Sequence, residues 1–153
     1  MQTRFVEANG FRFAVDEAGE GDHLALCLHG FPESYGETEP KPSAVKDYLI
    51  DRLMEDVGAL IDASGAKTVT LLGHDWGAGL AWTFAANRVR PLERLVIMNV
   101  PHPAVMSAQL ETNKAQRRKS WYMAFFQLPG VPELMLTANG GRAIKRAFFN
   151  MAV

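Results

Sequence analysis

The first thirty residues alternate between short apolar runs and turn residues, which predicts strands. Residues 11–15 carry apolar side chains at every second position, and Asn9-Gly10 precedes them, as in a two-residue β-hairpin. We therefore predict an antiparallel ribbon at the start of the chain. Residues 24–28 are apolar at every position, which is typical of a strand covered on both faces.

A longer segment, residues 43–63, has the spacing of an amphipathic helix. An apolar residue recurs at every fourth position: Val45, Leu49, Leu53, Val57 and Ile61. Ser43 is suited to cap the first turn and Gly65 to end the last one. We predict one continuous helix here, with a single buried face.

Two further short apolar runs, residues 68–72 and 95–99, predict buried strands. Residues 79–87 between them have a helical pattern. Strands that alternate with helices indicate an α/β fold with a mostly parallel sheet and flanking helices. Helices without strands follow, so we expect two parts, the α/β core at residues 1–103 and a helical layer at residues 104–153.

The composition of the 153-residue chain is that of an ordinary globular domain, with 48% hydrophobic and 22% charged residues. The formal net charge is -1, from 16 basic and 17 acidic residues, so no overall field attracts nucleic acid or a membrane. The start of the chain has no apolar run of signal-peptide length, and we expect a soluble, cytoplasmic protein with a small neutral partner. The single cysteine, Cys27, lies in an apolar run and is predicted to be a core residue. Nothing in the sequence predicts a metal site or a cofactor.

The candidate chemistry lies where the run at residues 68–72 changes abruptly into a helix. The sequence there is Gly73-His74-Asp75-Trp76-Gly77-Ala78-Gly79, the small-x-nucleophile-x-small pattern of a nucleophile elbow, with aspartate in the usual place of serine. A carboxylate that displaces an alkyl C–O or C–halogen bond forms an ester that water can cleave later, and its attack needs no general base. By itself, the spacing is equally typical of an aspartate that caps a helix.

A second motif, His29-Gly30-Phe31-Pro32-Glu33-Ser34, follows the run at residues 24–28. In α/β-hydrolases the loop at this place supplies one half of the oxyanion hole, and the residue after the nucleophile supplies the other half. We therefore predict that the backbone N–H groups of Phe31 and Trp76 converge on the carbonyl oxygen of an ester at Asp75.

These two motifs, together with Asn99-Val100-Pro101-His102-Pro103 and residues 121–130, resemble the epoxide hydrolase family of the α/β-hydrolase fold. The resemblance implies that Asp75 opens a small apolar epoxide through an alkyl-enzyme ester to give a diol. It also implies that residues 104–153 begin a helical cap, on which Tyr122 donates a hydrogen bond to the epoxide oxygen. The implied apolar walls of the substrate pocket are Phe31, Trp76, Phe125 and Phe126. Without the resemblance, Tyr122 would be one aromatic residue of a core stripe.

The chain departs from the family pattern in two places. Family members hydrolyse the ester with a late histidine, which an acidic residue orients, and none of the four histidines here occupies that place. A helix and a strand of the family pattern also lack a counterpart between Ser34 and Tyr35, since residues 31–43 show no periodicity that could supply them. We expect a truncated chain whose exposed core favours homodimers or aggregates.

Two other functions remain open. A haloalkane dehalogenase shares the aspartate and the following tryptophan, but it commonly has an asparagine where this chain has Phe31. A non-catalytic fragment is the second alternative, and the missing histidine supports it. A serine esterase is disfavoured because Asp75 occupies the elbow.

Overall fold

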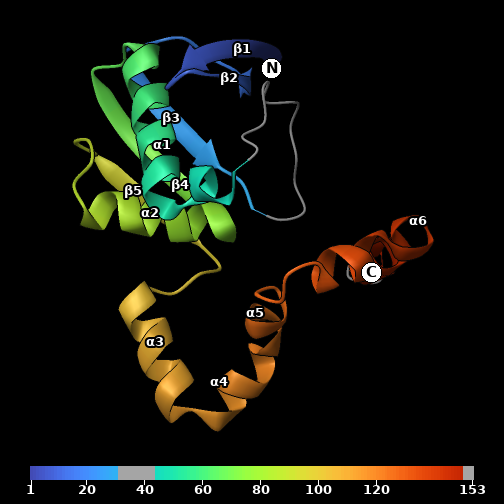
Figure 1. Cartoon of the computed structure of the whole chain (residues 1–153). Coiled ribbons are helices and arrows are strands. Elements are labelled where there is room, and N and C mark those ends of the chain that lie inside the picture. The colour runs from blue at the N-terminus through green and yellow to red at the C-terminus, as the bar shows by residue number, and fades with distance from the viewer. Residues whose placement is uncertain (31–43, 150–153) are drawn as a thin grey trace. The chain divides into compact units, whose positions relative to one another are not determined.

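The computed structural model describes residues 1–30 and 44–149 of the chain. The chain divides into two compact units, Met1–Pro103 and Ala104–Val153 (Figure 1). All strands among the described residues belong to the first unit.

The first unit begins with the predicted hairpin. Strands β1 (Gln2–Ala8) and β2 (Phe11–Glu17) pair in antiparallel register, with Ala8 opposite Phe11. Asn9 and Gly10 connect them with φ of 48° and 79°, and two successive left-handed residues match the twist of a tight hairpin. The hairpin prediction is confirmed.

A three-stranded parallel sheet follows, in the order β3-β4-β5. Its strands are β3 (His23–Leu28), β4 (Thr68–His74) and β5 (Arg94–Met98). One face packs against α1 (Ile50–Ser64) and α2 (Trp76–Ala86), and Leu71 and Phe84 are fully buried between the layers. The α/β class with a mostly parallel sheet and flanking helices is confirmed.

The predicted single helix over residues 43–63 is wrong at its start. A 3₁₀ turn, η1 (Val45–Tyr48), comes first, and Leu49 is extended with ψ of 149° before α1 begins. Tyr48 and Leu49 are exposed, so their burial stabilises a helical turn there only weakly. The end of the helix is as predicted, because Gly65 adopts φ of 66° and its N–H bonds to the carbonyl of Asp62.

The opposite face of the sheet remains exposed, which corrects the prediction that residues 24–28 are covered on both sides. Ala25 and Cys27 on β3 are exposed, as are Val96 at 39% and Met98 at 45% on β5. Cys27 is therefore not a core residue. Its apolar neighbours in the sequence point alternately to the two faces, and only one of these faces is packed.

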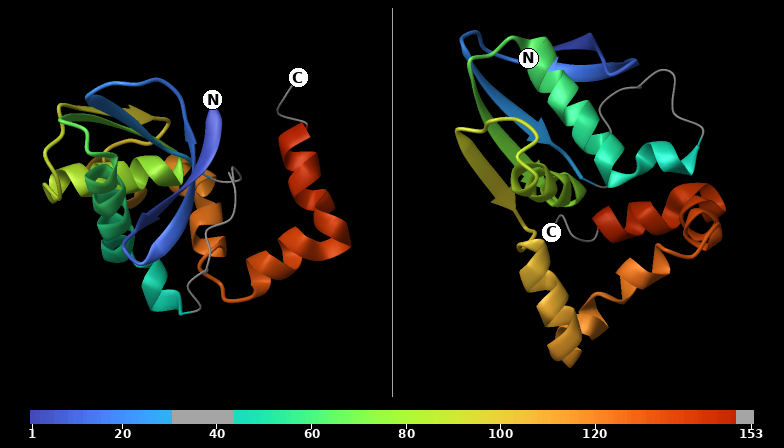
Figure 2. Two further views of the ribbon diagram at one scale, coloured as in Figure 1. Left: turned by 90° about the horizontal axis from the view of Figure 1, so that it is seen from above. Right: turned by 60° about the vertical axis from the view of Figure 1, so that its left-hand side comes forward.

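The hairpin and the parallel sheet are separate sheets, as the two views in Figure 2 also show.

The expected loss of a strand concerns the region after β3, and the junction of Ser34 and Tyr35 lies outside the described residues.

The second unit is helical in its described part. Its helices are α3 (Pro103–Thr112), α4 (Lys114–Lys119), α5 (Trp121–Phe125) and α6 (Val131–Phe149). The side chain of Asn113 accepts hydrogen bonds from the N–H groups of Ala115 and Gln116, which caps α4. Among the helices of the described residues, none combines the length and apolar composition that crossing a bilayer requires.

Candidate active site

Asp75 lies on the turn between β4 and α2, and its backbone is strained. Its φ is 50° and its ψ is -120°, a conformation that non-glycine residues rarely adopt. The predicted sharp strand-to-helix turn is confirmed. Such strain persists only where the surrounding structure holds the residue in place.

The carboxylate of Asp75 does not act as a helix cap. It makes no capping hydrogen bond with the first turn of α2, whereas its carbonyl oxygen accepts from the N–H groups of Ala78 and Gly79 at 3.0 and 3.2 Å. This removes the simplest structural explanation for an aspartate at the start of a helix. Asp75 still lies at the positive end of the dipole of α2.

Two glycines allow α2 to follow β4 so closely. A Cβ atom on Gly73 would lie 2.6 Å from the Cα of Ala78, and one on Gly77 would lie 2.6 Å from the carbonyl oxygen of His29. Real Cβ atoms essentially never come so near to backbone atoms. The small residues of the elbow motif are thus required by packing against the helix and against the end of β3.

The loop after β3 meets the elbow at Gly30. A Cβ atom on Gly30 would lie 2.6 Å from Oδ2 of Asp75. The His29-Gly30 motif therefore comes next to the candidate nucleophile, as its place after a parallel strand predicts. Phe31, the predicted second oxyanion donor and pocket wall, lies outside the described residues, so both of its roles stay predictions.

The other predicted pocket residues are divided between the units. Trp76 follows Asp75 directly, and 65% of it is exposed. Tyr122, Phe125 and Phe126 gather on α5 and after it, where the rings of Tyr122 and Phe126 have centroids 6.5 Å apart and those of Phe125 and Phe126 are 5.5 Å apart. These three residues belong to the second unit, and their approach to Asp75 stays a prediction.

One contact at the carboxyl end of β4 was not predicted from the sequence. Nδ2 of Asn99 lies 3.0 Å from Nε2 of His74, the residue that precedes Asp75. Asn99 follows β5 and has φ of 65°. Asn99 could have been identified as a candidate site residue, because it directly follows an apolar strand whose carboxyl end lies beside that of β4.

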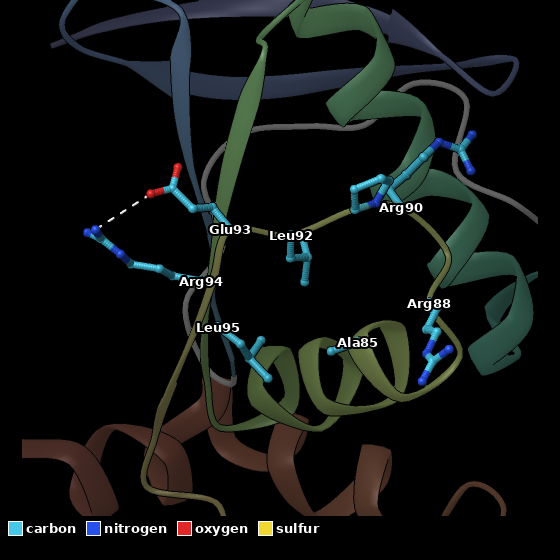
Figure 3. A pocket seen from close by; sticks show the side chains of 8 residues that line it. Ala85, Arg88, Arg90, Leu92, Glu93, Arg94 and Leu95 are labelled. Atoms are coloured by element: carbon cyan, nitrogen blue, oxygen red, sulfur yellow. Dashed lines mark ion pairs between the residues drawn. The ribbon is translucent and has the colours of Figure 1, made fainter.

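A surface hollow of about 510 Å³ lies near the amino end of β5 (Figure 3). Leu92, Leu95 and Ala85 line it, and Glu93 pairs with Arg94 at 3.5 Å on its rim. Ligands of open α/β sheets bind at the carboxyl ends of the strands, where Asp75 is, and this hollow is at the amino end of β5. We do not assign it to the reaction.

The described residues contain no group of three or more histidine, cysteine, aspartate or glutamate side chains that could hold a metal ion.

Comparison with known proteins identifies the family. Residues 28–133 match the family model of the alpha/beta hydrolase fold. The chain belongs to this family. The matched part of this α/β-hydrolase contains both motifs and all of its candidate site residues.

Individual relatives show which members of the family the chain resembles. The chain is 34% identical to the AB hydrolase superfamily protein YfhM of Bacillus subtilis, over 96% of this chain and 60% of that protein. It is 33% identical to epoxide hydrolase 4 of Homo sapiens, over 94% of this chain and 46% of that protein. A crystal structure of Bacillus megaterium epoxide hydrolase with an inhibitor matches 96% of this chain and 59% of its own at a TM-score of 0.86 and 30% identity. The resemblance to epoxide hydrolases is confirmed.

This α/β-hydrolase chain spans about half the length of the curated relatives that it matches. The alignment with the Bacillus subtilis protein covers 172 residues, more than the 153 of this chain, so the relative has residues within the matched region that are missing here. This agrees with the expected internal gap, without locating it.

All four histidines of the α/β-hydrolase chain are described. Nδ1 of His23 lies 2.7 Å from the hydroxyl of Thr68 at the amino end of the sheet, and Nδ1 of His29 lies 3.1 Å from the carbonyl of Gly30. The ring of His102 packs against that of Trp82 at 4.8 Å, and His74 contacts Asn99. Each ring thus has a local contact of its own.

Proposed function

We propose that the chain carries the nucleophile of an epoxide hydrolase, and that Asp75 is this nucleophile. The observation that carries the proposal is the strained conformation of Asp75 on the turn between β4 and α2, combined with a carboxylate that does not cap the helix. Backbone strain of this kind clusters at functional sites, and a nucleophile needs the place at the end of the sheet that this turn gives it.

The proposed first step is ring opening. A carboxylate oxygen of Asp75 forms a bond with one epoxide carbon, and the bond between that carbon and the epoxide oxygen breaks. The electron pair remains on the oxygen, which takes a proton from the hydroxyl of Tyr122 and becomes an alcohol. The product is a hydroxyalkyl ester that contains every atom of the epoxide.

Stabilisation of the ester during its hydrolysis is assigned to backbone amides. We propose the N–H of Trp76, at the start of α2, as one donor and the N–H of Phe31 as the other. In a protein that also has the base of the family pattern, this base takes a proton from water as the water adds to the ester carbonyl. The tetrahedral intermediate then releases the diol and restores the carboxylate.

The substrate that fits this proposal is a small apolar epoxide. Trp76, Phe125 and Phe126 supply apolar surface, and Phe31 is proposed to complete it. An epoxide is favoured over a haloalkane because the relatives named epoxide hydrolase match nearly the whole chain.

Turnover by the 153-residue chain is not expected. Ester hydrolysis needs a base that activates water, and none of the four histidines stands in the place that the family pattern gives this base. We therefore propose that the 153-residue chain is alkylated once and retains the ester.

The exposed sheet face supports the expected self-association. Cys27, Val96 and Met98 lie on it, and parallel sheets are normally covered on both faces. We propose homodimers or larger aggregates through this surface, which sedimentation at several protein concentrations tests.

Intact-mass spectrometry tests the proposed first step. The chain is incubated with styrene oxide, and the expected product is heavier by the full mass of one epoxide. Cys27 is exposed and thiols also open epoxides, so the experiment uses the Cys27→Ser variant throughout. Asp75→Ala in the same background is the control, and an equal adduct in this control would contradict the proposal.

A further inference from the structure

The carboxyl edge of the sheet holds a second strained residue beside the elbow. Among the described residues, four that are not glycine have positive φ, namely Asn9, Asp75, Arg88 and Asn99. Asn9 forms the hairpin turn and Arg88 follows α2, whereas Asp75 and Asn99 directly follow the neighbouring strands β4 and β5. Strain of this kind concentrates at functional sites, where the surroundings hold it.

The side chain of Asn99 contacts the residue that precedes Asp75. β4 and β5 are paired with His74 opposite Met98, so the residue after β5 reaches the end of β4. There Nδ2 of Asn99 lies 3.0 Å from Nε2 of His74. An amide nitrogen only donates, so this contact is a hydrogen bond in the tautomer of His74 that carries its ring proton on Nδ1.

The left-handed backbone of Asn99 is suited to this contact. Asparagine tolerates positive φ better than most residues, and its short amide reaches back to the adjacent strand. Glycine tolerates the same backbone but has no amide. The choice of asparagine therefore satisfies both the turn and the hydrogen bond.

We infer that Asn99 is a positioning residue for Asp75 and acts through His74. This inference rests on the proposed function. His74 is joined to Asp75 by one peptide bond, so a fixed imidazole restrains the backbone that leads into the strained turn. An attack on an epoxide carbon depends on the orientation of the carboxylate, and small displacements cost rate.

Alkylation kinetics test the role of Asn99 in the Cys27→Ser background. Asn99→Gly keeps the positive φ and removes the amide. We expect the maximal rate of adduct formation to fall by about two- to tenfold, as for the loss of one hydrogen bond, with an unchanged half-saturating epoxide concentration. The matched control is Asn9→Gly, which makes the same change at positive φ in the hairpin and is expected to leave the rate unchanged.

A double-variant cycle separates positioning through His74 from general loosening of the fold. In a His74→Ala background, Asn99→Gly is expected to have no further effect on the rate. An equal effect in both backgrounds, or an unchanged rate after Asn99→Gly alone, would overturn the positioning role. A chain with Asn99 intact that forms no adduct would contradict the proposed function and, with it, this inference.

The imidazole of His74 gives a readout that needs no reaction. In nitrogen-15 spectra we expect an unprotonated Nε2 whose resonance moves in Asn99→Gly and stays in place in Asn9→Gly. A resonance that does not respond to Asn99→Gly would overturn the inference, even in a variant that is too unstable for kinetics.

Discussion

Gly30 and Asp75 are so close that a Cβ atom on Gly30 would lie 2.6 Å from a carboxylate oxygen of Asp75. The loop after β3 and the turn after β4 are far apart in the sequence, and the parallel pairing of these strands brings them to the same edge. This contact links the two motifs that the sequence presents separately.

Gly30→Ala is expected to slow the alkylation of Asp75. The added methyl group must displace either the carboxylate or the loop, and a misplacement of about 1 Å can reduce a rate by about 10²-fold. Adduct formation with styrene oxide in the Cys27→Ser background measures this. An unchanged rate in a folded variant would show that the carboxylate does not need its present position.

Gly77→Ala is expected to destabilise the first unit by about 1–3 kcal/mol, because its Cβ would overlap the carbonyl oxygens at the end of β3. Urea unfolding measures the change. Gly79→Ala is the matched control, since nothing lies within 4 Å of a Cβ there and alanine favours a helix by about 1 kcal/mol over glycine. Equal stability changes in both variants would contradict the tight packing of α2 on β3.

Tyr122→Phe is expected to slow ring opening on the order of 10²-fold, because the departing oxygen loses its proton donor. The rate of adduct formation is the measurement, in a protein that contains the complete cap and in this chain. Tyr48→Phe is the matched control, since it removes the same hydroxyl from an exposed tyrosine of the first unit. If Tyr122→Phe alkylates as fast as its control, Tyr122 belongs to an aromatic stripe of α5.

The ion pair of Asp62 and Arg90 predicts a pH dependence of stability. Hydrogen bonding to Arg90 lowers the pKa of Asp62 below 3.8, and Nη2 of Arg90 lies 2.6 Å from Oδ2 of Asp62. A lowered folded-state pKa gives stability that is present above the unfolded value and is lost as the pH falls through the folded value. Asp62→Asn should thus lower the Tm at pH 7 slightly, and this difference should shrink as the pH falls through the folded-state pKa of Asp62. A Tm difference that stays constant as the solution is acidified would contradict the pair's contribution.

The sequence predicted most of the elements because local patterns decide them. Asn9-Gly10 identifies the hairpin, and Gly65 identifies the end of α1 through its left-handed conformation. The elbow was also predictable, because the close contacts of its turn require small residues at a fixed spacing, and this spacing is visible in the sequence. The break at Leu49 was not predictable, because the fourfold apolar spacing continues through a segment in which Tyr48 and Leu49 are exposed.

The exposure of Cys27 and the contact of Asn99 with His74 depend on tertiary structure. An apolar strand has the same sequence pattern whether one or both of its faces are covered, so the pattern predicted a buried Cys27. The contact at His74 requires the register of β4 and β5 and a left-handed residue after β5, which no local pattern specifies.

Tandem mass spectrometry of the alkylated Cys27→Ser chain tests the central claim most directly. After incubation with styrene oxide and proteolysis, the peptide that contains Asp75 is expected to carry the mass of one epoxide, with the fragment ions placing it on the Asp75 side chain. The ester should persist, and no diol should be released. An unmodified Asp75 together with modification at other residues would contradict the claim that Asp75 is the nucleophile.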